Sequence, residues 1–362
     1  MMAEDQVKTA YAGITDGGTA DGTVRGNVDG SLADGIVRSR TDGSLADLHL
    51  HLDGSLSVEN VFGLAKKDHI ELPADTPDGL RPYLTARADC GDLNEYLRCF
   101  DLPLAVLQTA ENLETGAYGL GKDLKEKGLC YAEIRFAPQL HCRQGLTQEE
   151  AVQAVLAGLL KAAEGSEGRI GLKAILCCMR GEKVRTANLE TIHVASKYLA
   201  RGVVAADLAG AEGLYPTRDF AEEFALARRL GVPFTIHAGE ADGPESIWKA
   251  LEFGAARIGH GVRAIEDEKL MDELAKRAIP LEMCPSSNLQ TKAVGSLKDY
   301  PLRDFLSRGI RVTVNSDNMT VSDTWAGKEY ALLSREYGLT EEEAVRLLND
   351  TKEAAFEMRQ RL

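Results

Sequence analysis

Residues 46–52 read ADLHLHL, an apolar segment in which two histidines alternate with leucines. In an extended chain, alternate side chains point to opposite faces, so the leucines share one face while His49 and His51 share the other. The segment therefore predicts a buried strand that presents two imidazoles on the face opposite its leucines. It continues directly into DGSL at 53–56, a sequence typical of a turn.

Seven further apolar segments of similar character follow along the chain. They are LCYAEIRFAP (129–138), IGLKAILCCM (170–179), GVVAADLAG (202–210), VPFTIHAGE (232–240), ARIGHG (256–261), IPLEMCPSSN (279–288) and IRVTVNSDN (310–318). Helical signals lie between them. Thr147 with Glu150, and Thr340 with Glu343, have the spacing of helix capping boxes, and residues 219–231 combine i, i+3, i+4 apolar spacing with a terminal glycine.

Eight strand segments that alternate with helical segments predict an α/β fold of the (β/α)8 TIM-barrel type. A doubly wound open sheet is the main alternative, and its dinucleotide-binding form needs a GxGxxG turn that the sequence lacks. Residues 53–128 are far longer than one crossover helix requires, and they contain two segments of helical pattern. They predict a helical insertion that forms a lid over the mouth of the barrel.

Residues 1–44 are rich in Gly, Asp, Thr and Ser and have little apolar periodicity. The hexapeptide DGSLAD occurs at 29–34 and again at 42–47, which an internal duplication would explain. Because such a composition cannot bury enough apolar surface to fold, we expect a disordered N-terminal extension. Residues 45–362 then form a single domain.

The composition narrows the classes of partner. The 362 residues carry a formal net charge of -14 and no run rich in lysine or arginine, which argues against nucleic acids and anionic membrane surfaces. No stretch approaches the roughly 18 consecutive apolar residues of a membrane span, and no secretory signal is visible. The seven cysteines form no CxxC pair, so neither a zinc ribbon nor a disulfide framework is expected. A cytoplasmic location fits best.

Polar residues gather at the C-terminal ends of the predicted strands, where the active site of a barrel lies. The set is His49, His51, His237, Glu240, His260 and Asp317. Neutral imidazoles together with a carboxylate suit Zn²⁺, and a catalytic zinc keeps one position open for water. Three histidines and Asp317 would hold the ion, leaving Glu240 and His260 as acid/base groups that deprotonate the water. The pattern predicts a hydrolase, since neither GxSxG nor a phosphate-binding GxxxxGK[ST] loop is present.

Several motifs together resemble the adenosine deaminase family. They are LHLHLDGSL (48–56), DLAG (207–210), TIHAGE (235–240), RIGHG (257–261), CPSSNLQT (284–291) and VNSDN (314–318). Their order and spacing match from residue 47 to the C-terminus. The resemblance implies one zinc ion per chain, held by His49, His51, His237 and Asp317.

The resemblance also implies the roles of the remaining groups. Glu240 would be a protonated carboxyl that donates to purine N1, and His260 would position and help deprotonate the water that zinc activates. The implied substrate contacts are His51, Asp53 to the ribose 5′-hydroxyl, Gly210 through its backbone N–H to N3, and Asn318. The expected reaction converts adenosine, or 2′-deoxyadenosine, to the inosine product and ammonia.

Two positions depart from the common family pattern. Asn318 stands where many members carry a second aspartate against purine N7, and Ala211 follows DLAG where an acidic residue is often seen. An Asn amide donates to N7 at any pH, so we interpret Asn318 as a variant of this contact rather than its loss. The residue leaves open which 6-aminopurine compound is the preferred substrate. The alternatives are another 6-aminopurine (adenine, a 5′-substituted adenosine or aminodeoxyfutalosine) or a non-catalytic zinc-binding relative. Oligomeric state and physiological pathway are not predicted.

Overall fold

The structure is a computed structural model that describes residues 45–86, 93–164 and 170–359. All of these residues belong to one compact unit that spans Leu32–Leu362. The predicted N-terminal extension, residues 1–44, lies outside the described residues, so its disorder and its separation from the domain stay predictions.

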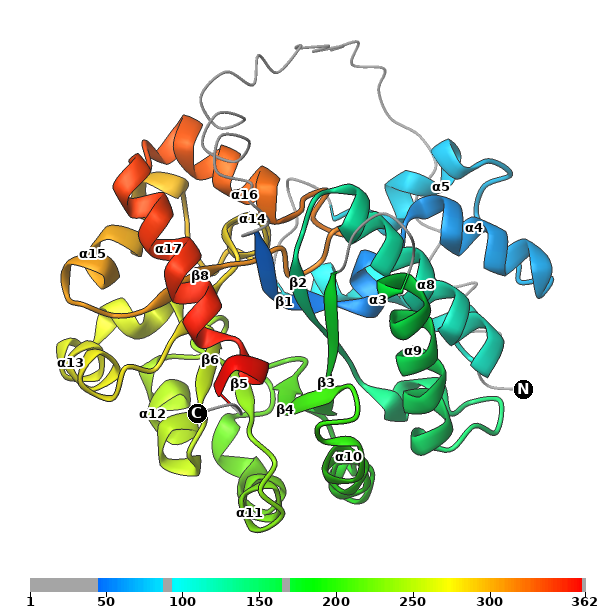
Figure 1. Ribbon diagram of the computed structural model, residues 1–362, viewed down its shortest axis with the longest axis horizontal. Coiled ribbons are helices and arrows are strands. Elements are labelled where there is room, and N and C mark those ends of the chain that lie inside the picture. The colour runs from blue at the N-terminus through cyan, green and yellow to red at the C-terminus, as the bar shows by residue number, and fades with distance from the viewer. Residues whose placement is uncertain (1–44, 87–92, 165–169, 360–362) are drawn as a thin grey trace. The chain divides into compact units, whose positions relative to one another are not determined.

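Among the described residues, eight parallel strands form the centre of this unit (Figure 1). They are β1 (Ala46–His51), β2 (Tyr131–Phe136), β3 (Gly171–Met179), β4 (Val203–Ala209), β5 (Thr235–Ala238), β6 (Arg257–His260), β7 (Leu281–Met283) and β8 (Val312–Val314). Each lies within one of the eight predicted segments. They pair in sequence order as two continuous runs, β1 to β4 and β5 to β8.

Backbone bridges join the two runs into a closed ring. Ala206 of β4 pairs with Phe234 just before β5, and Leu50 of β1 pairs with Asp317 after β8. At the second seam, the His51 N–H donates to the Asp317 carbonyl at 2.7 Å, and the Asp317 N–H donates to the His49 carbonyl at 2.8 Å. The prediction of a closed (β/α)8 barrel is confirmed, and the open-sheet alternative is wrong.

Helices follow the strands and surround the ring (Figure 1). Those of the outer layer are α9 (Gln148–Ala163), α10 (Arg185–Tyr198), α11 (Ala221–Arg229), α12 (Pro244–Phe253), α13 (Glu268–Arg277), α15 (Leu302–Ser307), α16 (Ala326–Leu332) and α17 (Glu341–Ala354). Both predicted capping boxes are present, at Thr147 with Glu150 and at Thr340 with Glu343. Shorter helical turns complete the connections: η2 (Pro138–His141), η3 (Thr217–Phe220), η4 (Val262–Glu266), α14 (Pro285–Gln290), η5 (Leu297–Asp299), η6 (Leu333–Tyr337) and α18 (Phe356–Arg359).

The segment between β1 and β2 is helical, as predicted for residues 53–128. It contains α3 (Leu52–Ser55), α4 (Val58–Lys67), α5 (Pro77–Leu84), α6 (Leu93–Leu97), η1 (Arg98–Phe100), α7 (Asp101–Val106) and α8 (Ala110–Glu126). The last of these, α8, packs against α9 in the outer layer as a crossover helix would. The shorter helices before it bring side chains to the mouth of the barrel.

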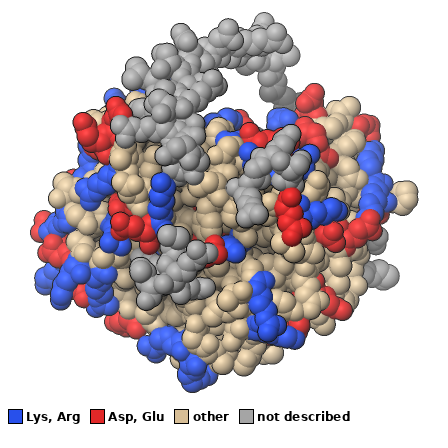
Figure 2. All heavy atoms as spheres, in the orientation of Figure 1, with Lys and Arg blue, Asp and Glu red and all other residues tan. Residues whose placement is uncertain are grey.

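The surface and the helices bear on the predicted partners. On the face shown in Figure 2, acidic and basic side chains are interspersed rather than separated by sign. None of the helices in the described ranges is long and apolar enough to span a membrane. No cysteine in the described ranges forms a disulfide. The expected absence of nucleic-acid binding and the cytoplasmic location stay predictions.

Candidate active site

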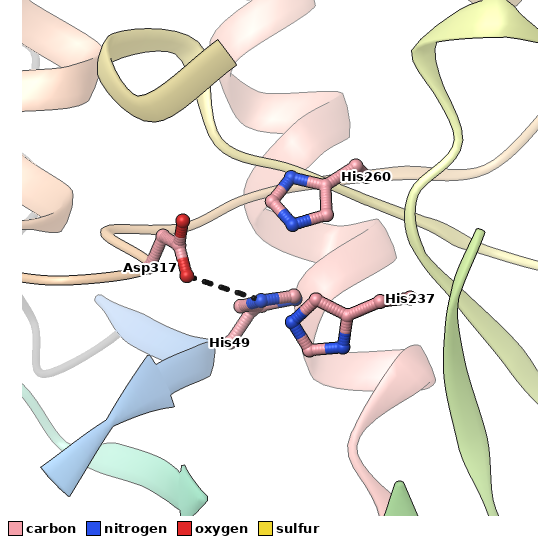
Figure 3. Close-up of side chains that lie close together, drawn as sticks. All are labelled: His49, His237, His260 and Asp317. Carbon is pink, nitrogen blue, oxygen red and sulfur yellow. Dashed lines mark ion pairs between the residues drawn. The ribbon is translucent and has the colours of Figure 1, made fainter. Parts of the chain in front are cut away.

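Four side chains from different strands converge at the C-terminal mouth of the barrel. One potential ligand atom from each of His49, His237, His260 and Asp317 lies within 4.8 Å of the others, and all four residues are buried. His49 lies in β1, His237 in β5 and His260 at the end of β6, while Asp317 follows β8. Figure 3 shows the three imidazoles side by side, with the Asp317 carboxylate directed at His49.

His51, the second histidine of β1, reaches the same cluster. Its Nε2 lies 3.2 Å from Nε2 of His237 and 3.4 Å from Oδ1 of Asp317. Oδ1 of Asp317 also lies 3.4 Å from Nε2 of His49. The structure therefore brings together all four residues that the sequence suggested as metal ligands, with His260 beside them.

Buried carboxylates hold two of these imidazoles in one orientation. Nδ1 of His49 lies 2.8 Å from Oε2 of Glu282, and Nδ1 of His237 lies 3.0 Å from Oδ2 of Asp207. Because each Nδ1–H donates to a carboxylate, Nε2 keeps its lone pair and points into the cluster. Nε2 of His49 is buried and has no hydrogen-bond partner among the described residues. An orphaned imidazole nitrogen facing a carboxylate and further imidazoles fits a metal ion of zinc-like preference.

An arginine below the cluster connects the two carboxylates. Arg135 of β2 is fully buried and donates to Asp207 and to Glu282, each at 2.9 Å, and to the Leu48 carbonyl at 2.7 Å. Burial alone would raise the pKa of Glu282, but Arg257 and Arg135 hold it well below its ordinary value. Glu282 is therefore ionised and available to accept from His49.

Two of the clustered residues adopt an unusual backbone conformation. His260 has φ 60° and Asp317 has φ 59°, both in the left-handed region that non-glycine residues rarely occupy. Such conformations cost about 1–3 kcal/mol each and persist where the surrounding structure imposes them. Here the adjoining strands fix both residues. Gly259 makes room for His237 and His49, because a Cβ at that position would lie 3.0 Å from Cα of His237 and 3.2 Å from Cε1 of His49.

His260 is neutral and anchored by an amide. Burial lowers its pKa well below the ordinary value. Its Nδ1 lies 3.0 Å from Nδ2 of Asn288, whose Oδ1 accepts from the Tyr300 hydroxyl at 3.0 Å and from the Cys284 N–H at 3.4 Å. With the amide in this orientation, Nδ1 is the acceptor and the ring proton lies on Nε2. Nε2 faces Glu240 Oε2 at 3.5 Å.

Glu240 lies just after β5 with 5% of its surface exposed. Its Oε1 accepts from the Thr291 hydroxyl at 3.0 Å. Burial, together with the charges of Asp317 and Glu212, raises the pKa of Glu240 well above its ordinary value. A carboxyl in this setting keeps its proton at neutral pH and can donate it.

A cavity of about 290 Å³ opens directly onto this cluster. Its wall includes the three further residues that the sequence suggested as substrate contacts, Asp53, Gly210 and Asn318. The helical insertion supplies an apolar side of the same cavity, made of Leu93, Tyr96, Leu97, Phe100 and Leu104. The cavity thus combines a few polar groups with a mostly apolar lining, as small-molecule sites do.

Comparison with known proteins identifies the family of the chain. Residues 44–361 match the family model described as adenosine deaminase. The chain is 56% identical over 313 residues to an adenosine deaminase of Haemophilus ducreyi, covering 86% of this chain and 91% of that protein. The chain belongs to the adenosine deaminase family. An adenosine deaminase of Clostridium botulinum is 42% identical over 315 residues, with 86% and 92% of the two chains covered.

Among solved structures, the chain resembles an adenine deaminase of Arthrobacter aurescens. The TM-score is 0.78 at 28% sequence identity, and the match covers 87% of this chain and 94% of that chain. The chain therefore shares its barrel fold with a relative that is named for another purine, adenine.

Several residues that build the site were not singled out in the sequence. Arg135, Glu282 and Tyr96 belong to this group, as does Glu212, whose carboxylate accepts from the backbone of the Glu240 loop. One signal was available for the first two, since a charged residue inside an apolar strand is almost always paired. Tyr96 and Glu212 carry no such pattern, because they lie in helix and loop sequence of ordinary composition.

Proposed function

We propose that this chain catalyses the hydrolytic deamination of adenosine and 2′-deoxyadenosine, releasing ammonia, with one zinc ion per chain. Relatives named adenosine deaminase at 56% and 42% identity support this proposal. The observation that carries it is that Asp53, Gly210, Glu240 and Asn318 line one cavity together with the histidine cluster.

The metal would be held by His49, His51, His237 and Asp317. Support comes from the short distances among their Nε2 and Oδ1 atoms, and from the unpartnered Nε2 of His49. Zinc bound there supplies Lewis-acid chemistry and lowers the pKa of a bound water toward about 7. Three imidazoles and one carboxylate match its preference for nitrogen and oxygen ligands.

The polar groups of the cavity match the edges of a purine nucleoside. Glu240 would face N1, the backbone N–H of Gly210 would face N3, and the Asn318 amide would face N7. Asp53 would accept from the ribose 5′-hydroxyl. Gly210 has φ 105°, directly follows β4 and lines the cavity with its main chain alone.

The reaction then follows from where protons can be held. A water oxygen attacks C6, a C–O bond forms, and Glu240 donates its proton to N1, which removes electron density from the ring. His260, with its proton on Nε2, would position the attacking oxygen by donation and stabilise negative charge on it, so in this tautomer it would not be the base that the resemblance implied. One proton of the attacking water passes to the 6-amino group, which leaves as ammonia when the C6–N bond breaks. The second water proton returns to the Glu240 carboxylate as the C6 carbonyl of the inosine base forms.

The main alternative within the family is adenine, since the adenine deaminase of Arthrobacter aurescens shares the fold. Asp53 argues for a nucleoside, because its buried carboxyl group would have no hydroxyl to accept from in the free base. A phosphate at the 5′ position would bring a second negative charge against the same carboxylate. We therefore expect nucleosides to be preferred over both adenine and nucleotides.

A substrate panel tests the proposal. The zinc-loaded protein would be assayed with adenosine, 2′-deoxyadenosine, adenine, AMP and aminodeoxyfutalosine, by the absorbance change of the purine and by ammonia release. We expect adenosine and 2′-deoxyadenosine to have the highest kcat/KM. Faster turnover of adenine or of aminodeoxyfutalosine would replace the proposed substrate. Stoichiometric zinc without turnover of any compound would indicate a non-catalytic relative.

A further inference from the structure

The Glu212 carboxylate, in the loop after β4, is surrounded by hydrogen-bond donors from the loop after β5. The side chain is 1% exposed and contacts no group that the proposed reaction uses directly. Its five donors are Gly239 N–H at 2.7 Å and the Ser246 hydroxyl at 2.5 Å to Oε1, and Glu240 N–H at 3.0 Å, Ala241 N–H at 2.8 Å and Asp242 N–H at 3.1 Å to Oε2.

Four of these donors are consecutive backbone amides, and the second belongs to Glu240. The preceding residue, Gly239, has φ 72°, and a Cβ there would lie 2.4 Å from Cδ1 of Ile247, so only glycine fits this turn. On the other side, Nε of Arg263 donates to the Glu240 carbonyl at 3.2 Å. Hydrogen bonds thus hold the backbone of Glu240 on both sides, and they fix the direction in which its side chain points.

Glu212 also lies two residues after Gly210, the residue proposed to face N3. The carboxylate therefore ties the loop that carries Gly210 to the loop that carries Glu240. Because both loops face the same ring of the substrate, their separation fixes the distance between the groups directed at N3 and N1. A misplacement of about 1 Å at such a contact can lower turnover by about 10²-fold.

We propose that Glu212 is a positioning residue for Glu240, holding its carboxyl group at the height and angle that protonation of purine N1 requires. The inference rests on the proposed function. It concerns placement, since Glu212 touches the main chain of Glu240 and would not touch the substrate. A carboxylate is suited to this role because it is an acceptor at every position, so both of its oxygens can receive amide protons.

The variant Glu212→Gln tests whether Glu212 positions Glu240 or only fills space. Glu212→Gln keeps the shape of the side chain but replaces one carboxylate oxygen with an NH₂ group. That group would face backbone N–H donors, and it cannot accept a hydrogen bond from them. We expect kcat for adenosine to fall by about 10²-fold and KM to rise by about tenfold, because the contact between Glu240 and N1 is lost in the bound substrate as well as in the transition state. Glu223→Gln, which neutralises another buried glutamate on α11, is the matched control and should leave both constants unchanged.

The decisive readout uses an inhibitor that lacks the N1 acceptor. In 1-deazaadenosine a C–H group replaces N1, so the wild type should bind it at least about tenfold more weakly than adenosine. In Glu212→Gln that preference should fall close to one, because a displaced Glu240 no longer contacts N1. A purely structural role would lower stability but leave the ratio of the two affinities unchanged, and this result would overturn the proposal.

Two further variants keep the test decisive. In a Glu240→Gln background, Glu212→Gln should reduce kcat little further, whereas independent effects would multiply and contradict the proposal. If Glu212→Gln does not fold, Ser246→Ala removes one donor and leaves four, and a fall in the N1 preference is expected; an unchanged preference would overturn the proposal. Wild-type protein inactive on adenosine would refute the proposed function, while an active wild type with an unaffected Glu212→Gln would refute the positioning role alone.

Discussion

The proton on Glu240 is the single feature on which the proposed chemistry depends most. Its carboxyl group is buried, and its pKa is raised well above the ordinary value by that burial and by neighbouring negative charge. Glu240→Gln keeps the shape but has no acidic proton to transfer, so we expect kcat/KM for adenosine to fall by about 10²–10⁴-fold. Zinc content, measured by elemental analysis, should stay at one per chain.

Two results would contradict the prediction for Glu240→Gln. A Glu240→Gln enzyme with near-normal turnover would show that N1 is protonated by another group or not at all. Loss of zinc from the same variant would show instead that Glu240 supports the metal. Glu223→Gln again serves as the control for removing a buried carboxyl group.

At the scale of single residues, the sequence was informative where rare side chains stand at predicted strand ends. His49, His51, His237, His260 and Asp317 were found in this way, and the structure places them together. The tautomers, however, depend on Glu282 and Asp207, which approach from other strands. Contacts between residues so far apart in the chain leave no local pattern, so the sequence alone could not predict them.

At the scale of elements, the helical insertion reaches the substrate residues through one tyrosine. The hydroxyl of Tyr96, in α6, accepts from Nδ2 of Asn318 at 2.9 Å and lies 2.7 Å from Oγ of Ser322. Tyr96→Phe would leave the buried Asn318 amide without that partner, at a cost of about 1–3 kcal/mol. We expect kcat/KM for adenosine to fall by about tenfold.

The specificity of the Tyr96 effect can be measured with 7-deazaadenosine, which has no N7 acceptor. If Tyr96 orients Asn318 toward N7, its inhibition constant should change less than about twofold in Tyr96→Phe. Equal losses for both compounds would mean that the hydroxyl supports the lid alone. Tyr118→Phe, on α8 of the same insertion, removes a hydroxyl that does not line the cavity and is the control.

Helix α16 carries a buried carboxyl group that links elements near the site. Glu329 accepts from the Ser286 N–H at 3.1 Å and from the Thr324 hydroxyl at 2.6 Å, and burial raises its pKa from 4.5 to about 7. A raised pKa means that the fold favours the protonated form. Its contribution to the free energy of unfolding is therefore complete below pH 4.5 and is lost as the pH rises through about 7.

Glu329→Gln removes this pH dependence because the amide does not titrate. Relative to the wild type, the variant should gain about 2–3 kcal/mol in the free energy of unfolding between pH 5 and pH 8. Urea unfolding of both proteins at the two pH values measures the change. An equal difference at both pH values would contradict it, and Glu342→Gln, at an exposed position of α17, is the control.

The elements themselves were largely predictable, although their ends were not. Buried parallel strands are nearly continuous apolar runs, which is why all eight were found. The segment 279–288 was longer than the strand it contains, since β7 ends at Met283 and α14 begins at Pro285. Proline is common in the first turn of a helix, so Pro285 marks the boundary between strand and helix, which the continuous apolar pattern did not show.

At the scale of the whole molecule, the proposed active site depends on barrel closure. His49 and His51 lie on β1 and Asp317 lies after β8, and the backbone hydrogen bonds that close the ring run between these same residues. The sequence predicted a barrel from the number and alternation of its elements. It could not predict that the closing seam would carry three of the suggested metal ligands, because the pairing joins residues near the two ends of the chain.

The proposed active site lies between residues 49 and 318, and the family model begins at residue 44. We therefore expect removal of residues 2–40 to leave kcat/KM for adenosine within about twofold of the full chain. Steady-state kinetics on both forms, with the unfolding midpoint as a second readout, test this expectation. A large loss of activity or of folded yield would show that these residues contribute to the domain.

The most direct test of the proposed metal-dependent deamination is a zinc titration of metal-free protein followed by ammonia release from adenosine. We predict negligible turnover after chelation, a rise in rate proportional to added zinc, and saturation at one zinc per chain. Elemental analysis of the saturated protein should give the same stoichiometry. Full activity in the metal-free protein, or no ammonia release from adenosine at one bound zinc per chain, would contradict the proposal.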